Sequence, residues 1–154
     1  QMRIKLKKNL HFRTNFDTLE FSFTYKNKID FSKGNRYHQL GKGWHWPENP
    51  EDNFRWIERQ AYCYLECLEK PNKLKISGYS PIDTRLSIYF ENQLLGVYQA
   101  SVKKNFKLEY PLPYKADKRY LFTVKIQSTK QVVKDIDRDP RELSVQVFSV
   151  EVTA

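Results

Sequence analysis

Hydrophobic residues recur at every second position in the second half of the chain. Leu86, Ile88 and Phe90 alternate with polar residues, and after a polar turn at 91–93 the pattern resumes at 95–98. Such alternation is typical of a half-buried β-strand, because successive side chains point to opposite faces of the sheet. The two segments and the turn between them therefore predict a β-hairpin.

The same pattern predicts strands elsewhere in the chain. Near the C-terminus the apolar positions change phase, from Leu143, Val145 and Val147 to Phe148, Val150 and Val152. A change of phase inside a strand indicates one extra residue, so we expect a β-bulge there. Further strands are expected at 19–25, at 74–76 with an end at Gly78, at 106–110, at 120–126 and, from a weaker pattern, at 11–13.

These segments predict the fold class. Eight to ten short strands at intervals of about 8–12 residues indicate an all-β protein, an antiparallel β-sandwich of jelly-roll or immunoglobulin-like type. Helical periodicity is confined to one turn at 51–58. With 154 residues, the chain has the size of one domain, so we expect a single domain over 1–154. Because it begins with Gln1, we expect this domain to be part of a longer protein.

The charge of the chain favours an anionic partner. There are 27 basic and 18 acidic residues, which gives a net charge of +9. Such an excess suits a nucleic acid, an acidic glycan or an anionic membrane surface. The lysines are dispersed and mostly alternate with apolar residues, which places them on the solvent faces of strands. Since no recognised nucleic-acid motif accompanies the charge, we do not expect nucleic-acid binding.

The two cysteines, Cys63 and Cys67, lie in one expected strand. Positions four apart in a strand share a face but are about 13 Å apart, too far for a disulfide or a shared metal ion. We expect both thiols to be reduced and to face inward with Ala61 and Leu65. Free buried thiols suit the cytoplasm.

A long polar and aromatic loop at 30–53, with the residues that follow it, contains all three tryptophans of the chain. Two interpretations remain open. The indole rings are a platform on which sugar rings stack, with neighbouring polar groups bonding to hydroxyls, or they plug one end of the sandwich above an Arg55–Glu48 pair. Two exposed tryptophans would favour the first and three buried ones the second. The candidate carbohydrate-binding residues are Trp44, His45, Trp46, Glu48, Arg55 and Trp56.

Other chemistry finds little support in the sequence. No nucleophile elbow, phosphate loop or dinucleotide fingerprint occurs, so we expect no catalytic residues and no cofactor. The histidines His11, His38 and His45 have no spacing typical of a zinc site, and we expect no metal. The segment 135–139 has alternate carboxylates like a calcium loop but lacks the glycine and glutamate of that motif. We expect a solvated turn there, with calcium as the open alternative.

Several motifs together resemble a known family. They are Gly43-Trp44 through Glu48, Phe54-Arg55-Trp56, the hairpin at 86–98, and 139–143 leading into 148–152. This set is similar to an accessory β-sandwich domain appended to bacterial glycosyltransferases and methyltransferases of cell-surface polysaccharide synthesis. The resemblance covers about residues 40–152, and it departs from the pattern at Ser144, where the family usually has glycine.

The resemblance implies a non-catalytic, carbohydrate-binding-like module that binds a glycan or positions an acceptor. Its implied partners are a glycan or polysaccharide and the parent glycosyltransferase domain. Its implied location is the cytoplasm, at the periphery of the inner face of the membrane. The alternative is a protein-interaction or structural domain that docks through its basic face onto the parent enzyme or an anionic membrane surface.

Overall fold

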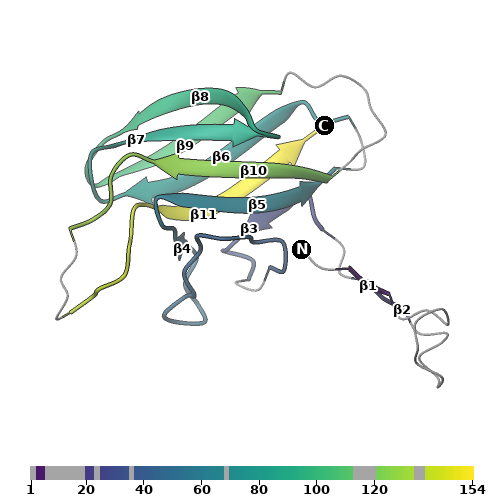
Figure 1. The fold of residues 1–154 in the computed structure, drawn as a ribbon, viewed down its shortest axis with the longest axis horizontal. Coiled ribbons are helices and arrows are strands. Elements are labelled where there is room, and N and C mark those ends of the chain that lie inside the picture. The colour runs from purple at the N-terminus through teal and green to yellow at the C-terminus, as the bar shows by residue number, and fades with distance from the viewer. Residues whose placement is uncertain are drawn as a thin grey trace.

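The computed structural model describes residues 3–5, 20–22, 25–34, 37–67, 70–112, 121–133 and 138–154. All regular structure within these ranges is β-structure. Two antiparallel sheets pack face to face as a sandwich (Figure 1), which confirms the predicted fold class. A separate ribbon of two short strands, β1 (Arg3–Lys5) and β2 (Glu20–Ser22), lies beside the sandwich. β2 falls inside the strand expected at 19–25, while the expected strand at 11–13 is outside the described residues.

The first sheet has four strands in the order β5-β10-β7-β8. The hairpin predicted at 86–98 is formed by β7 and β8, which pair antiparallel. Glu91 and Asn92 between them both have positive φ, 50° and 66°, as a two-residue hairpin turn requires. The bounds of the strands are Gln60–Glu66 for β5, Leu121–Ser128 for β10, Thr84–Phe90 for β7 and Gln93–Ala100 for β8.

The second sheet has five strands. Its order is β3-β11-β6-β9, with β4 pairing the same edge of β11 as β3. The predicted β-bulge is confirmed, because the register of β11 against β6 shifts between Val147 and Ser149. The bounds of the strands are Lys28–Asp30 for β3, Arg55–Trp56 for β4, Lys73–Ser80 for β6, Lys104–Pro111 for β9 and Gln146–Thr153 for β11.

Two local expectations are wrong. The first concerns strand β6, which continues through Gly78 to Ser80. At Gly78 a Cβ atom would overlap the backbone of Gln146 and the ring of Phe106. The glycine thus permits close packing within the sheet and does not end the strand. The segment 51–58 contains the extended strand β4 in place of a helical turn, since its backbone pairs with β11.

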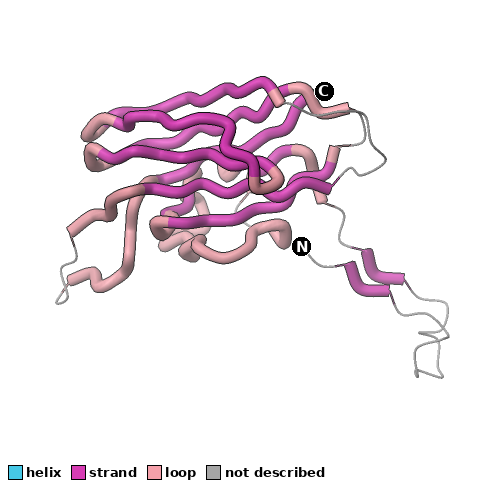
Figure 2. Tube along the Cα trace, turned by 45° about the horizontal axis from the view of Figure 1, so that its top comes forward, coloured by secondary structure: helices cyan, strands magenta, loops and turns pink. Residues whose placement is uncertain are grey.

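The core lies between the two sheets. It is built from the inward residues of each strand, and alternation along β5, β6, β7 and β10 buries every second side chain. Each fully buried Val, Leu or Ile contributes about 1.5–3 kcal/mol relative to an exposed position. Figure 2 shows the strands as two layers, with the loop before β4 lying along one side of them. This loop contains most of the candidate residues.

Candidate functional site

The segment 39–45 closes one side of the sandwich by pairing with both sheets in turn. It first follows β5, where Gly41 N donates to Tyr62 O at 2.7 Å and Tyr62 N donates to Lys42 O at 2.9 Å. It then follows the segment that contains β4, where Glu58 N donates to Gly43 O at 2.8 Å. Gly43, with φ of 94°, occupies the change of direction, a conformation that favours glycine. This path sets the positions of the tryptophans that follow.

Trp44 is a structural residue. Its Nε1 atom donates to Tyr62 O at 2.7 Å, and its ring packs against the core, 5.8 Å from the ring of Phe31. Its backbone forms an antiparallel bridge with Ile57. A partly buried indole whose only polar group is hydrogen-bonded to the backbone holds the loop onto the sheet.

Trp56 is also partly buried. It lies in β4 opposite Gln146 of β11. Its ring and that of Phe54 pack edge to face, with centroids 6.4 Å apart. Its carbonyl accepts a hydrogen bond from His45 N at 2.9 Å. Trp56 therefore helps to join the loop to the second sheet.

Trp46 differs from the other two, because 78% of it is exposed to solvent. Beneath it lies Arg55, whose guanidinium carbon is 5.1 Å from the centre of the Trp46 ring and 5.7 Å from that of Phe31. Arg55 is buried and donates from Nη1 to His45 O at 3.5 Å, and burial lowers the pKa of its guanidinium. A cation under an indole ring attracts its face. Arg55 thus contacts one face of Trp46, and most of the ring is open to water.

Glu48 does not pair with Arg55, so the ion pair expected in the structural interpretation is wrong. Its Oε1 atom instead accepts a bond from Arg141 Nη2 at 2.7 Å. Arg141 also binds Asp139 through Nε at 2.8 Å and Nη2 at 2.7 Å. These bonds hold the pKa of Asp139 at about 2, and they raise the pKa of Arg141. Motif residues from the loop before β4 and from the turn before β11 therefore meet in one network.

The turn at 139–142 also contacts His45. Its Nε2 atom is 2.7 Å from Glu142 O, so the imidazole is hydrogen-bonded to the backbone of the turn. Of the candidate residues, the structure brings Trp46, Arg55 and Glu48 into one neighbourhood with Arg141. His45, Trp44 and Trp56 instead attach the loop to the rest of the domain.

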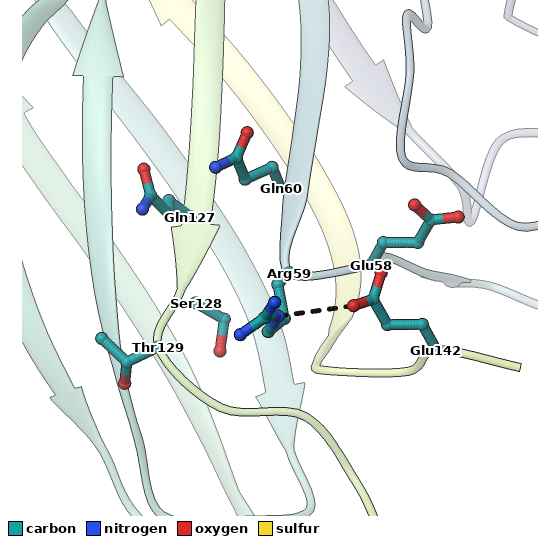
Figure 3. A pocket seen from close by; sticks show the side chains of 7 residues that line it. All are labelled: Glu58, Arg59, Gln60, Gln127, Ser128, Thr129 and Glu142. Atoms are coloured by element: carbon teal, nitrogen blue, oxygen red, sulfur yellow. Dashed lines mark hydrogen bonds and ion pairs between the residues drawn. The ribbon is translucent and has the colours of Figure 1, made fainter. Parts of the chain in front are cut away.

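On the other side of this turn lies a polar cleft of about 490 Å³ (Figure 3). Two of its lining residues, Gln60 of β5 and Gln127 of β10, are directly opposite each other in the first sheet. Two others form an ion pair, in which Arg59 Nε is 3.3 Å from Glu142 Oε1. The residues that line the cleft are Glu58, Arg59, Gln60, Gln127, Ser128, Thr129 and Glu142. No sequence pattern predicts these residues, because polar residues from three distant segments share no motif.

Ser144, where the family pattern has glycine, is fully buried. Its hydroxyl is 2.8 Å from Glu58 O and 3.1 Å from Ile57 O, and it donates to these carbonyls. These bonds attach the segment before β11 to the segment that directly follows β4.

The cysteines lie as predicted. Both are free and buried, and Cys63 faces the core with Ala61 and Leu65. Burial raises the pKa of the Cys63 thiol to about 12.

The described ranges contain no group of three or more His, Cys, Asp or Glu side chains that could hold a metal ion. Residues 135–137 of the calcium alternative lie outside these ranges, and Asp139 is bonded to Arg141. Within the same ranges, no helix is long and apolar enough to span a membrane.

No protein-family model matches the chain, and no curated protein is similar to it in sequence. Solved structures share its fold. One is an arabinoxylan arabinofuranohydrolase of glycoside hydrolase family 43 from Bacillus subtilis, with a TM-score of 0.51 and 9% identity over 92% of this chain. The chain spans 30% of that protein's length.

Two carbohydrate-binding modules also align with the chain. The CBM36-1 domain of a multidomain xylanase from the hindgut metagenome of Trinervitermes trinervoides has a TM-score of 0.48 and 9% identity, with 82% of this chain and 95% of that one covered. A family 35 carbohydrate binding module from an environmental isolate has a TM-score of 0.45 and 13% identity, with 86% and 85% covered. These similarities concern the fold, an antiparallel β-sandwich.

Proposed function

We propose that this domain is a non-catalytic module that binds a glycan, with a sugar ring stacked on the open face of Trp46. The exposure of Trp46 carries the proposal. An indole in water forgoes about 2–3 kcal/mol of burial, and tryptophan is enriched at binding surfaces, where one side of the ring is apolar and the other wet. Among the described residues, no other tryptophan is exposed to this extent.

The surroundings of Trp46 suit a ligand with an apolar face. Because the Arg55 guanidinium lies beneath the ring, the indole is held in place before a ligand arrives. A preorganised side chain loses little conformational entropy on binding. Sugars present faces of C–H bonds, so a fixed indole is a suitable platform for a pyranose ring.

The polar groups beside the platform suit the hydroxyls of the same ligand. The Glu48 side chain is 62% exposed although it pairs with Arg141, so it has oxygen lone pairs directed to solvent. Carboxylate and guanidinium groups form charge-assisted hydrogen bonds, which are stronger than neutral ones. The cleft beyond the 139–142 turn adds the amides of Gln60 and Gln127.

The sequence resemblance supplies the biological setting of the proposal. It implies a module of a bacterial glycosyltransferase or methyltransferase that acts in the cytoplasm on cell-surface polysaccharide. In this setting the module would hold the acceptor glycan near the catalytic domain of the parent protein. Docking onto that parent or onto an anionic membrane remains the alternative, and it predicts no glycan binding by the isolated domain.

A glycan array tests the proposal. We expect the labelled wild-type domain to bind a defined set of oligosaccharides, Trp46→Ala to lose these signals, and Val133→Ala, a change at another exposed apolar residue, to keep them. Bound oligosaccharides should be recovered unchanged in length. An array without wild-type binding would favour the docking alternative, and shortened or extended products would show that the domain is catalytic.

A further inference from the structure

Three side chains form a row across the outer face of the first sheet. Lys125 of β10 is directly opposite Tyr62 of β5 on one side and Tyr89 of β7 on the other. Neighbouring strands are about 4.8 Å apart, so the three residues lie side by side. Each alternates with buried residues of its own strand and is itself partly exposed. The row therefore faces solvent on the side of the sheet away from the core.

The ammonium group of Lys125 is held in place on this row. Its Nζ atom is 4.0 Å from the centre of the Tyr89 ring, whose face attracts a cation. No ion pair within the described ranges includes Lys125. The carboxylate of Glu91, in the turn after Tyr89, instead accepts a hydrogen bond from Thr123 N at 3.0 Å. Since an ammonium group has three donors, Lys125 can bind an acceptor from solution.

The polar cleft adjoins this row. Gln127 follows Lys125 by two residues on the same face of β10, about 7 Å along the strand. It lies opposite Gln60, and both residues line the cleft of about 490 Å³ (Figure 3). The Tyr62 hydroxyl donates to Gln60 Oε1 at 3.5 Å. The row and the cleft thus form one continuous surface.

The centre of this face is basic. The four strands of the first sheet contain three charged residues, Glu66, Arg85 and Lys125, and alternation with buried residues places all three on the outer face. Lys125 and Arg85 belong to the neighbouring strands β10 and β7, whereas Glu66 is the last residue of β5. A protein of net charge +9 also attracts anions over a longer range.

We propose that the outer face of the first sheet is a second saccharide site, selective for an acidic sugar whose carboxylate binds Lys125. An ammonium–carboxylate contact is a charge-assisted hydrogen bond. The amides of Gln60 and Gln127 both donate and accept hydrogen bonds, as sugar hydroxyls do. This inference rests on the proposed function in taking a glycan as the ligand, and it adds a site and the charge of the sugar bound there.

The distribution of charge favours an acidic sugar over a nucleic acid. Nucleic-acid affinity comes mainly from many phosphate contacts along a basic surface. Here the cleft beside the row is lined by the carboxylates of Glu58 and Glu142, which repel a chain of phosphates. A single carboxylate among neutral hydroxyls fits one lysine beside two amides.

Titrations followed by amide chemical shifts test this inference with two disaccharides that differ by one carboxylate, cellobiouronic acid and cellobiose. We expect the wild type to bind cellobiouronic acid at least about fivefold more tightly, as one charge-assisted hydrogen bond predicts. The largest shift changes should occur in β5, β7 and β10. Lys125→Met should abolish the preference, and Lys125→Arg, which keeps the charge, should retain most of it. The matched change Lys107→Met, at an exposed lysine of the second sheet, should have no effect.

The outcomes separate this site from the one at Trp46. Trp46→Ala should bind cellobiouronic acid like the wild type, so an array result against Trp46 would leave this inference standing. Equal affinity of the wild type for the two disaccharides, or shift changes confined to the Trp46 loop, would overturn it. Tighter binding of a single-stranded decanucleotide, lost in Lys125→Met, would also overturn it and assign the face to nucleic acid.

Discussion

Trp44 and Trp46 are two residues apart and have opposite surroundings. Trp44 packs on the core and bonds to Tyr62 O, whereas Trp46 is 78% exposed above the Arg55 guanidinium. The exposure criterion formulated from the sequence therefore has a divided result, with one exposed and two partly buried tryptophans. At the scale of single residues, the loop contains both a structural attachment and a candidate binding surface.

Stability measurements should separate these two tryptophans. Trp44→Ala should lower the free energy of unfolding by about 3–5 kcal/mol, the usual effect of removing a large packed side chain. Trp46→Ala should change it by less than about 0.5 kcal/mol, as exposed substitutions usually do. Urea denaturation of both variants checks this expectation. Equal losses would mean that Trp46 is a structural residue as well.

The Cys63 thiol should be inert in the folded protein. Burial raises its pKa from 9.0 to about 12, so the folded state keeps the neutral thiol. Its contribution to stability is complete below pH 9 and is lost as the pH rises toward 12, because the unfolded thiol ionises first. Ellman titration at pH 8 should therefore label Cys63 only after denaturation. Rapid labelling of the native protein would show that the inward orientation of β5 is wrong.

At the scale of elements, the segment 39–45 determines where the site lies. It pairs first with β5 and then with the segment that contains β4, and Gly43 lies where the chain passes from one to the other. A Cβ atom on Gly43 would overlap the backbone of Gln60 and Ala61. The position of Trp46 thus depends on a residue that has no side chain.

Gly43→Ala should disturb both the fold and the site. Since its φ of 94° is strained for alanine, we expect a loss of at least about 2 kcal/mol in the free energy of unfolding. Weaker glycan binding should accompany the loss, because Trp46 follows Gly43 closely in the chain. Lys42→Ala, at an exposed neighbour, is the control and should change neither property. Wild-type stability of Gly43→Ala would show that another path for the loop is available.

The Asp139–Arg141–Glu48 network should respond to acid. Hydrogen bonds from Arg141 lower the pKa of Asp139 from 3.8 to about 2, so the folded state favours its carboxylate. The associated stability is complete above pH 4 and is lost between pH 4 and pH 2. The urea midpoint of the wild type should therefore fall more steeply over this interval than that of Asp139→Asn. Parallel curves for the two proteins would contradict the network in solution.

The strands were predictable from the sequence because their signal is local. Period-two alternation located the 86–98 hairpin, and its change of phase located the bulge near Phe148. The prediction at Gly78 was wrong, since the sequence does not distinguish a glycine that permits close packing from one that ends a strand. The candidate site was predictable only in part. The Arg141–Glu48 contact and the polar cleft are formed by residues from distant segments, and a local sequence pattern does not predict such contacts.

At the scale of the whole molecule, the candidate site lies at one edge of the sandwich. The β5 edge is closed by the loop that displays Trp46, and β8 is the strand at the opposite edge of the first sheet. The Trp46 surface therefore belongs to the β5 side of the sandwich.

Isothermal titration with an oligosaccharide selected from the array tests the central claim most directly. We expect the wild type and Val133→Ala to bind with equal affinity and Trp46→Ala to bind at least about tenfold more weakly, since one aromatic contact at a binding site is worth about 1–2 kcal/mol. Thermal midpoints measured on the same samples should agree within a few degrees. Unchanged affinity in Trp46→Ala would contradict the claim that a sugar stacks on this ring.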